Sequence, residues 1–117
     1  MYSISKRFDF SAAHHLNGLP PEHPCSRIHG HNYSVTLHLK SEILTKEGFV
    51  LDYRKLDVFK SWLDENFDHQ DLNEKMQGID PTAENLAKYC YDVWAEDLGL
   101  FAVTVKETDK TEARYES

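Results

Sequence analysis

The chain of 117 residues is 40% hydrophobic, which suits one packed domain over residues 1–117. Its first residues alternate polar and apolar side chains, unlike a signal peptide, and it has only two cysteines. These features predict a cytoplasmic protein with reduced thiols. Its net charge of -7 argues against broad electrostatic binding to nucleic acid or to an anionic membrane. No apolar run approaches the roughly 20 residues that cross a bilayer, so we expect a small-molecule partner.

Two long strands are predicted in the first third of the chain. Residues 2–10 alternate apolar and polar side chains, as a half-buried strand does, and lead to His14. A loop over residues 16–28 follows, because an Asn-Gly pair and three prolines supply turns and exclude regular hydrogen bonding. Residues 31–39 alternate most clearly, and His31 is in phase with their apolar face.

Two helices are predicted in the middle of the chain. Apolar residues at helical spacing over 56–67 predict a helix that Asp52 caps and that ends near Asn66. A second helix is expected to begin around residues 80–84, where Asp or Thr can cap and Pro suits the first turn, and Gly99 ends it. Its predicted buried stripe consists of Leu86, Tyr89, Cys90, Val93 and Trp94.

Alternation returns over residues 101–107 and, after a turn at 108–111, in a short strand through Tyr115. The order strand, strand, helix, helix, strand, strand predicts an α+β fold, a four-stranded antiparallel sheet with both helices on one face. The opposite face would then need cover, which favours an oligomer.

Three histidines are candidate metal ligands. In an extended segment His29 and His31 point to the same side, and Gly30 between them lets the backbone approach closely. His14 ends a strand that can pair beside them. Three neutral imidazoles with an open fourth position are typical of a catalytic zinc site, although any single histidine is more often a surface or core residue.

The two cysteines are expected to differ. Cys25 lies in the loop just before His29 and is a fourth zinc ligand, a packing residue or a reactive thiol. Beside a metal and histidines its pKa would fall, which would supply a thiolate as base or nucleophile. Cys90 falls on the apolar stripe of the second helix, where a packing role is expected.

Two carboxylates need an explanation. Asp68 precedes His69, but adjacent residues rarely hydrogen-bond side chain to side chain, and a capped turn is the alternative. Glu107 occupies the inward phase of its strand, where a carboxylate is costly unless something donates to it. It is either an edge position outside the core or an acceptor for two parallel N–H donors of a guanidine-like ring.

Together these motifs resemble the 6-pyruvoyl-tetrahydropterin synthase family. Three residues separate Cys25 from His29, a spacing similar to that of the branch that forms a 6-carboxy product. Gln70 departs from the pattern, since some relatives have a second histidine there. The segments that carry the resemblance are residues 10–14, 25–31, 51–53, 67–69, 71–73, 81–85 and 105–108.

The resemblance implies the tunnelling fold (T-fold), in which trimers join their sheets into a barrel and two trimers stack into a homohexamer with active sites between subunits. It implies a zinc-dependent lyase of queuosine biosynthesis that converts 7,8-dihydroneopterin triphosphate to 6-carboxy-5,6,7,8-tetrahydropterin, acetaldehyde and triphosphate. Position by position, the implied zinc ligands are His14, His29 and His31, and the implied catalytic residues are Cys25, Asp68 and His69. The last two could act from a neighbouring subunit.

The resemblance also implies substrate-binding residues. Glu107 would anchor the amino-pyrimidine ring of the pterin, and Thr82 and Glu84 match a pterin-side motif. Arg27 and Lys106 are the nearest cations for an anionic substrate. Two alternatives remain: the pyruvoyl-forming activity of the family, which releases no acetaldehyde, and a non-enzymatic zinc or pterin-binding module, which has no turnover.

Overall fold

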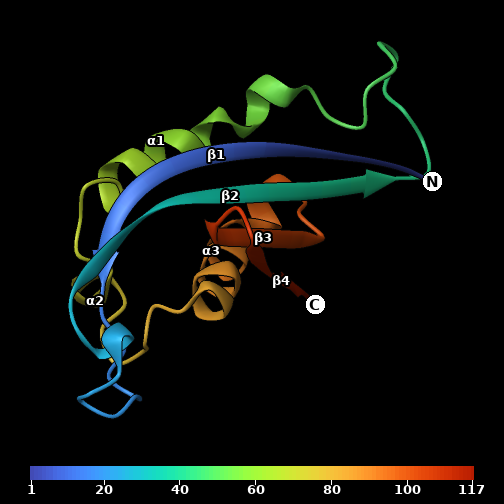
Figure 1. Ribbon diagram of the computed structural model, residues 1–117. Helices are drawn as coiled ribbons and strands as arrows, with labels where there is room; N and C mark the ends of the chain where they lie inside the picture. Colours follow the sequence, from blue (N-terminus) through green and yellow to red (C-terminus); the bar gives the residue numbers. More distant parts are fainter.

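The computed structural model describes residues 1–117 as a curved antiparallel sheet packed against helices (Figure 1). The molecule is elongated, 56 × 25 × 25 Å, because the first two strands are long. Its elements are β1 (Tyr2–His14), the 3-10 turn η1 (Pro24–Ser26), β2 (His29–Ser41), the 3-10 turn η2 (Tyr53–Leu56), α1 (Asp57–Asn66), α2 (Leu72–Lys75), α3 (Ala83–Leu98), β3 (Ala102–Thr108) and β4 (Thr111–Glu116).

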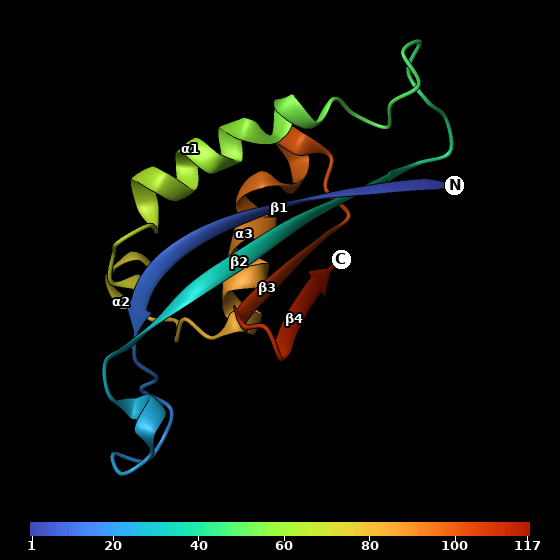
Figure 2. The same ribbon diagram turned by 45° about the horizontal axis from the view of Figure 1, so that its top comes forward.

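The strands lie side by side in the order β1-β2-β3-β4, each antiparallel to the next, which confirms the predicted sheet (Figure 2). β1 and β2 pair over their whole length, from Tyr2 opposite Ser41 to His14 opposite His29. The end of β1 and the start of β2 therefore meet at one end of the sheet.

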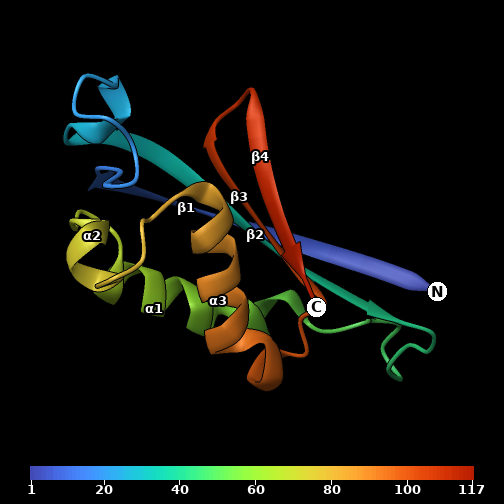
Figure 3. The same ribbon diagram turned by 90° about the horizontal axis from the view of Figure 1, so that it is seen from below.

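The core lies between one face of the sheet and the helices α1 and α3 (Figure 3). Phe8 and Phe10 of β1 and Tyr33 and Val35 of β2 are each at most 6% exposed, as their alternation predicts. Burying a side chain of this size contributes about 1.5–3 kcal/mol. The rings of Phe10 and Tyr33 stack with centroids 4.9 Å apart, just below the histidine end of the sheet.

The opposite face of the sheet is polar. Arg7, Asp9 and Ser11 of β1 alternate with the buried residues, and Asn32 and Ser34 of β2 lie beside them along a shared cavity. Such side chains tolerate water, so this face does not require apolar cover. The oligomer stays a prediction that depends on the family resemblance.

The first helix begins later than predicted. Asp52 accepts a hydrogen bond from a backbone amide as expected, but the turn that it caps is 3-10, and α1 begins only at Asp57. α3 agrees better with the sequence: Thr82 caps it by accepting from the Asn85 amide at 3.1 Å, and Gly99 ends it in the left-handed conformation, with φ 71°.

The predicted apolar stripe of α3 is wrong at Val93, which is 43% exposed. The buried face of the helix is centred between Leu86 and Ala87, both at most 1% exposed, so Val93 lies at its margin at 100° per residue.

The four-residue helix α2 was also not predicted, because its apolar pattern is too short to have a period. No helix is long and apolar enough to cross a membrane.

Candidate active site

The predicted metal ligands converge where β1 ends and β2 begins. His14 lies opposite His29 in the strand register, and His31 lies two residues further along β2 on the same face. One ligand nitrogen from each ring lies within 4.8 Å of the other two, with His14 buried and the others half-buried. The expected convergence of the three rings is confirmed.

Backbone carbonyls fix the protonation of two of these rings. The Nδ1 of His14 donates to the Pro81 oxygen at 2.7 Å, and the Nδ1 of His29 donates to the Arg27 oxygen at 2.8 Å. Both Nε2 atoms then carry lone pairs, and they face each other at 2.9 Å. Two lone pairs this close repel each other unless a proton or a metal ion bridges the two nitrogens, so the pair fits a metal ion.

Burial favours the neutral form of His14 and His31. Burial is the largest effect on the pKa of His14 and of His31 and lowers both. The Nε2 of His31 is buried without a hydrogen-bond partner. Neutral imidazole is the form that binds metal ions, and three such ligands suit a catalytic zinc ion.

Cys25 is a free, half-buried thiol in η1 and lies outside the histidine cluster. Its amide donates to the Nδ1 of His23 at 3.1 Å, and its carbonyl oxygen accepts from the Leu16 amide at 2.9 Å, which ties the turn to the chain just after β1. Cys90 is fully buried, and burial raises the pKa of its thiol. A packing role therefore fits Cys90, while Cys25 stays accessible for chemistry.

Asp68 and His69 contact each other, contrary to the expectation for adjacent residues. The Nδ1 of His69 lies 3.0 Å from the Oδ2 of Asp68. The contact depends on the backbone of His69, the only non-glycine residue with a positive φ, at 59°. This left-handed conformation costs about 1–2 kcal/mol for a residue with a Cβ, and such strain is concentrated at functional sites.

Ser11 of β1 holds this pair in place. Its amide donates to the Oδ1 of Asp68 at 2.9 Å, and its carbonyl oxygen accepts from the His69 amide at 2.6 Å. Two residues further on, the Ala13 amide donates to the Gln70 carbonyl at 3.1 Å, so the segment follows the free edge of β1. The Ser11 amide, and then the His69 ring, lower the pKa of Asp68. The ionised carboxylate keeps a proton on Nδ1 and leaves Nε2 of His69 free.

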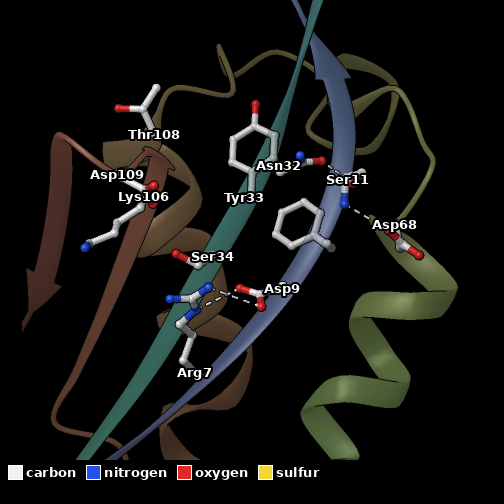
Figure 4. A pocket seen from close by; sticks show the side chains of 11 residues that line it. Arg7, Asp9, Ser11, Asn32, Tyr33, Ser34, Asp68, Lys106, Thr108 and Asp109 are labelled. Atoms are coloured by element: carbon white, nitrogen blue, oxygen red, sulfur yellow. Dashed lines mark hydrogen bonds and ion pairs between the residues drawn. The ribbon is translucent and has the colours of Figure 1, made fainter.

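Two cavities flank the pair. One of about 360 Å³ opens on the polar face of the sheet, and Asp68, Arg7 and Lys106 line it from different segments of the chain (Figure 4). The other, of about 590 Å³, is lined by His69 and His31. The side chain of His69 is 82% exposed, so it is available to groups outside its own segment.

Glu107 lies on β3 beside the histidines. Its Oε2 is 3.3 Å from the Nε2 of His31, and its side chain is 26% exposed. The preceding residue, Lys106, lines the cavity on the opposite face, so the two do not share a site. The accessible, half-buried carboxylate fits an acceptor for N–H donors better than an edge position outside the core.

The other predicted substrate-binding residues surround this end of the sheet without converging. The Thr82 hydroxyl caps α3, and Glu84 is exposed in the first turn of that helix. The side chain of Arg27 is exposed on the loop, beside a separate cavity.

Sequence reasoning missed three supporting groups. The carbonyl of Pro81 and the backbone of Ser11 have no sequence signal, because any residue supplies such atoms. Tyr33 did have a sequence signal, because the alternation of the strand puts its side chain on the same face as His31. Its ring packs edge-on to His14 and His31, with centroids 5.8 and 5.5 Å away. Burial, the main cause, raises the pKa of Tyr33, so its hydroxyl stays protonated.

Fold and site together define the class: a tunnelling-fold protein that gathers three histidines, a typical metal site, at the end of a four-stranded sheet. More particularly, the chain belongs to the 6-pyruvoyl tetrahydropterin synthase family, whose sequence pattern matches residues 3–117.

Similar proteins narrow the comparison. The chain is 33% identical to the 6-carboxy-5,6,7,8-tetrahydropterin synthase of Rickettsia felis, over 76% of this chain and 77% of that one. It is 34% identical to the protein of the same name from Synechocystis, over 98% and 93%. The structure of Caenorhabditis elegans 6-pyruvoyl tetrahydropterin synthase matches with a TM-score of 0.86 and 27% identity, covering 99% of this chain and 95% of that one.

Proposed function

We propose that this protein is a zinc-dependent carbon–carbon lyase, a 6-carboxytetrahydropterin synthase of queuosine biosynthesis. It converts 7,8-dihydroneopterin triphosphate and one water molecule to 6-carboxy-5,6,7,8-tetrahydropterin, acetaldehyde and triphosphate. The observation that carries the proposal is the pair of facing Nε2 atoms of His14 and His29, 2.9 Å apart, with His31 and Glu107 beside them. The relatives named 6-carboxy-5,6,7,8-tetrahydropterin synthase support the choice of reaction.

The three histidines would hold the zinc ion. Bound there, zinc supplies a Lewis acid that makes hydroxyl groups of the substrate side chain more acidic. Around this centre, the carboxylate of Glu107 accepts two parallel N–H bonds from the amino-pyrimidine ring and so fixes the orientation of the pterin.

Cys25 and the Asp68–His69 pair move protons in the proposed mechanism. The ionised Asp68 holds the Nδ1–H of His69, which leaves the Nε2 of His69 available for proton transfer. The thiol of Cys25 is accessible for the complementary transfer. Because His69 is 82% exposed, it can serve a thiol of a neighbouring subunit, and this favours a homohexamer with active sites between subunits.

The remaining substrate contacts are proposed from the positions of the residues in the sequence motifs. Thr82 and Glu84, at the start of α3, border the pterin, and Arg27 contacts the triphosphate. The protein would perform this reaction in the cytoplasm, where its thiols stay reduced.

Product analysis tests the proposal. The zinc-loaded protein is incubated with 7,8-dihydroneopterin triphosphate, and acetaldehyde, triphosphate and the 6-carboxy product are measured together. Equal amounts of all three are expected. Triphosphate without acetaldehyde would indicate the pyruvoyl-forming reaction instead, and the absence of all three would indicate a binding module. Light scattering of the same sample gives the oligomeric state, and a monomer at micromolar concentration contradicts the homohexamer.

A further inference from the structure

The side chain of Tyr33 carries a hydroxyl group that makes no hydrogen bond within the fold. The side chain is 1% exposed, and its hydroxyl is buried with no hydrogen-bond partner. A buried polar group without a partner is unfavourable, and in native proteins it calls for an explanation such as a bound ligand.

The packing of Tyr33 requires its ring and not its hydroxyl. The ring stacks on Phe10 with an interplanar angle of 9° and contacts the edges of His14 and His31. A phenylalanine would make these same contacts. The hydroxyl is therefore superfluous to the core and is left to interact with whatever occupies the site.

The strand register puts Tyr33 beside Glu107. The last residues paired between β2 and β3 are Ser34 and Lys106, and one antiparallel step further Tyr33 comes opposite Glu107. Both side chains belong to the face that carries His31, whose Nε2 is 3.3 Å from the Oε2 of Glu107. The residues that carry an acceptor carboxylate and a donor hydroxyl are thus neighbours on one face, and the hydroxyl has no hydrogen-bond partner in this chain.

A heterocycle edge with two N–H donors and an adjacent acceptor complements this pair. The amino-pyrimidinone edge of a pterin has this pattern, with a 2-amino group, a ring N–H and a carbonyl oxygen. We infer that Tyr33 is a further substrate-binding residue, whose hydroxyl donates to the carbonyl oxygen of the pterin ring while Glu107 accepts from the two N–H groups. The inference rests on the proposed function and adds a residue that recognises the ring.

The variant Tyr33→Phe separates this role from a structural one, because it removes the hydroxyl and keeps the ring. In the zinc-loaded protein without pterin, its melting temperature should equal or exceed that of the wild type. Its Kd for pterin, measured by quenching of pterin fluorescence, should rise about 2- to 13-fold, the range of one neutral hydrogen bond. In turnover KM should rise with kcat nearly unchanged, because the ring contact is the same in ground and transition states.

The matched control is Tyr115→Phe, the same change on β4, where the ring packs on Tyr91 away from the histidines. It should leave pterin affinity unchanged. An unaltered Kd for pterin in Tyr33→Phe overturns the inference, and so does a lower melting temperature, which would mean that the hydroxyl stabilises the fold. A wild type that binds no pterin overturns the proposed function and the inference together, and differs from both of these results.

Discussion

Zinc should stabilise this protein strongly, and the stabilisation should depend on His29. The Nε2 atoms of His14 and His29 face each other at 2.9 Å while their Nδ1 atoms donate to backbone carbonyls, so in the neutral rings the two Nε2 lone pairs repel each other. A cation bound there removes this repulsion. Because the unfolded chain does not hold the three rings together, the binding free energy adds to the free energy of unfolding.

At a free zinc concentration 1,000 times Kd the gain is about 4.1 kcal/mol. The unfolding entropy of 117 residues, at about 2.1 cal/mol/K per residue, is roughly 250 cal/mol/K, so the melting temperature should rise by about 16 °C. If His29→Ala weakens binding 1,000-fold, the same zinc concentration gives only about 0.4 kcal/mol, or about 2 °C.

The assay is thermal unfolding followed by near-ultraviolet circular dichroism, with a chelator and then with zinc. The matched control is His38→Gln, which changes a histidine of the same strand on the opposite face; its hydrogen bond is to Thr104, and it should keep the full zinc-dependent rise. A rise in His29→Ala as large as that of the wild type would refute the assignment of His29 as a ligand.

Three further predictions concern single residues. Cys25→Ala should lose about 10²- to 10⁴-fold in turnover while keeping its zinc, and in the native wild type a thiol reagent should modify Cys25 but reach Cys90 only after unfolding; zinc lost from the variant contradicts this. His69→Gly should lose turnover similarly yet stay within about 1 kcal/mol of the wild-type unfolding free energy, because glycine relieves the positive φ; a loss above about 2 kcal/mol in urea denaturation contradicts it. Burial, and then the charge of Arg114, lower the pKa of His38, while Glu112 and Glu116 of β4 act in the opposite direction. The unfolded state therefore binds the proton more readily, and the free energy of unfolding should fall as the pH drops below about 6.5. His38→Gln should reduce the difference between the free energies of unfolding at pH 7.5 and pH 5.5, measured by urea denaturation. An unchanged difference counts against a contribution of His38 to the pH dependence.

The sheet and the cluster of three histidines could be predicted because both depend on strand periodicity. Alternation fixes which face each side chain occupies, and His29 and His31 fall on one face at any register. The register itself, which puts His14 opposite His29, follows from pairing of the two strands over their full length. Convergence of the three rings was therefore accessible from spacing alone.

The Asp68–His69 contact could not be predicted, because it depends on one backbone angle. A sequence pattern gives no signal that a histidine adopts φ 59°, since this conformation is unfavourable locally and is stabilised by distant contacts. Those contacts come from the backbone of Ser11, 57 residues away in sequence from Asp68. Predictions from local patterns fail where tertiary hydrogen bonds determine the geometry.

The charge of the protein can be reconciled with an anionic substrate once its ion pairs are known. Six of the thirteen lysines and arginines already contact carboxylates, as Arg7 contacts Asp9 at 2.9 Å. Of the cations without an ion pair, Arg27 lies two residues before the candidate metal ligand His29, and Lys106 lines the cavity next to Asp68. The net charge of -7 belongs to the whole chain and does not describe the charge near the candidate site, where Arg27 is close in sequence to Cys25 and Lys106 shares a cavity with Asp68. Of the seven lysines and arginines without an ion pair, these two are the ones we expect to compensate a triphosphate.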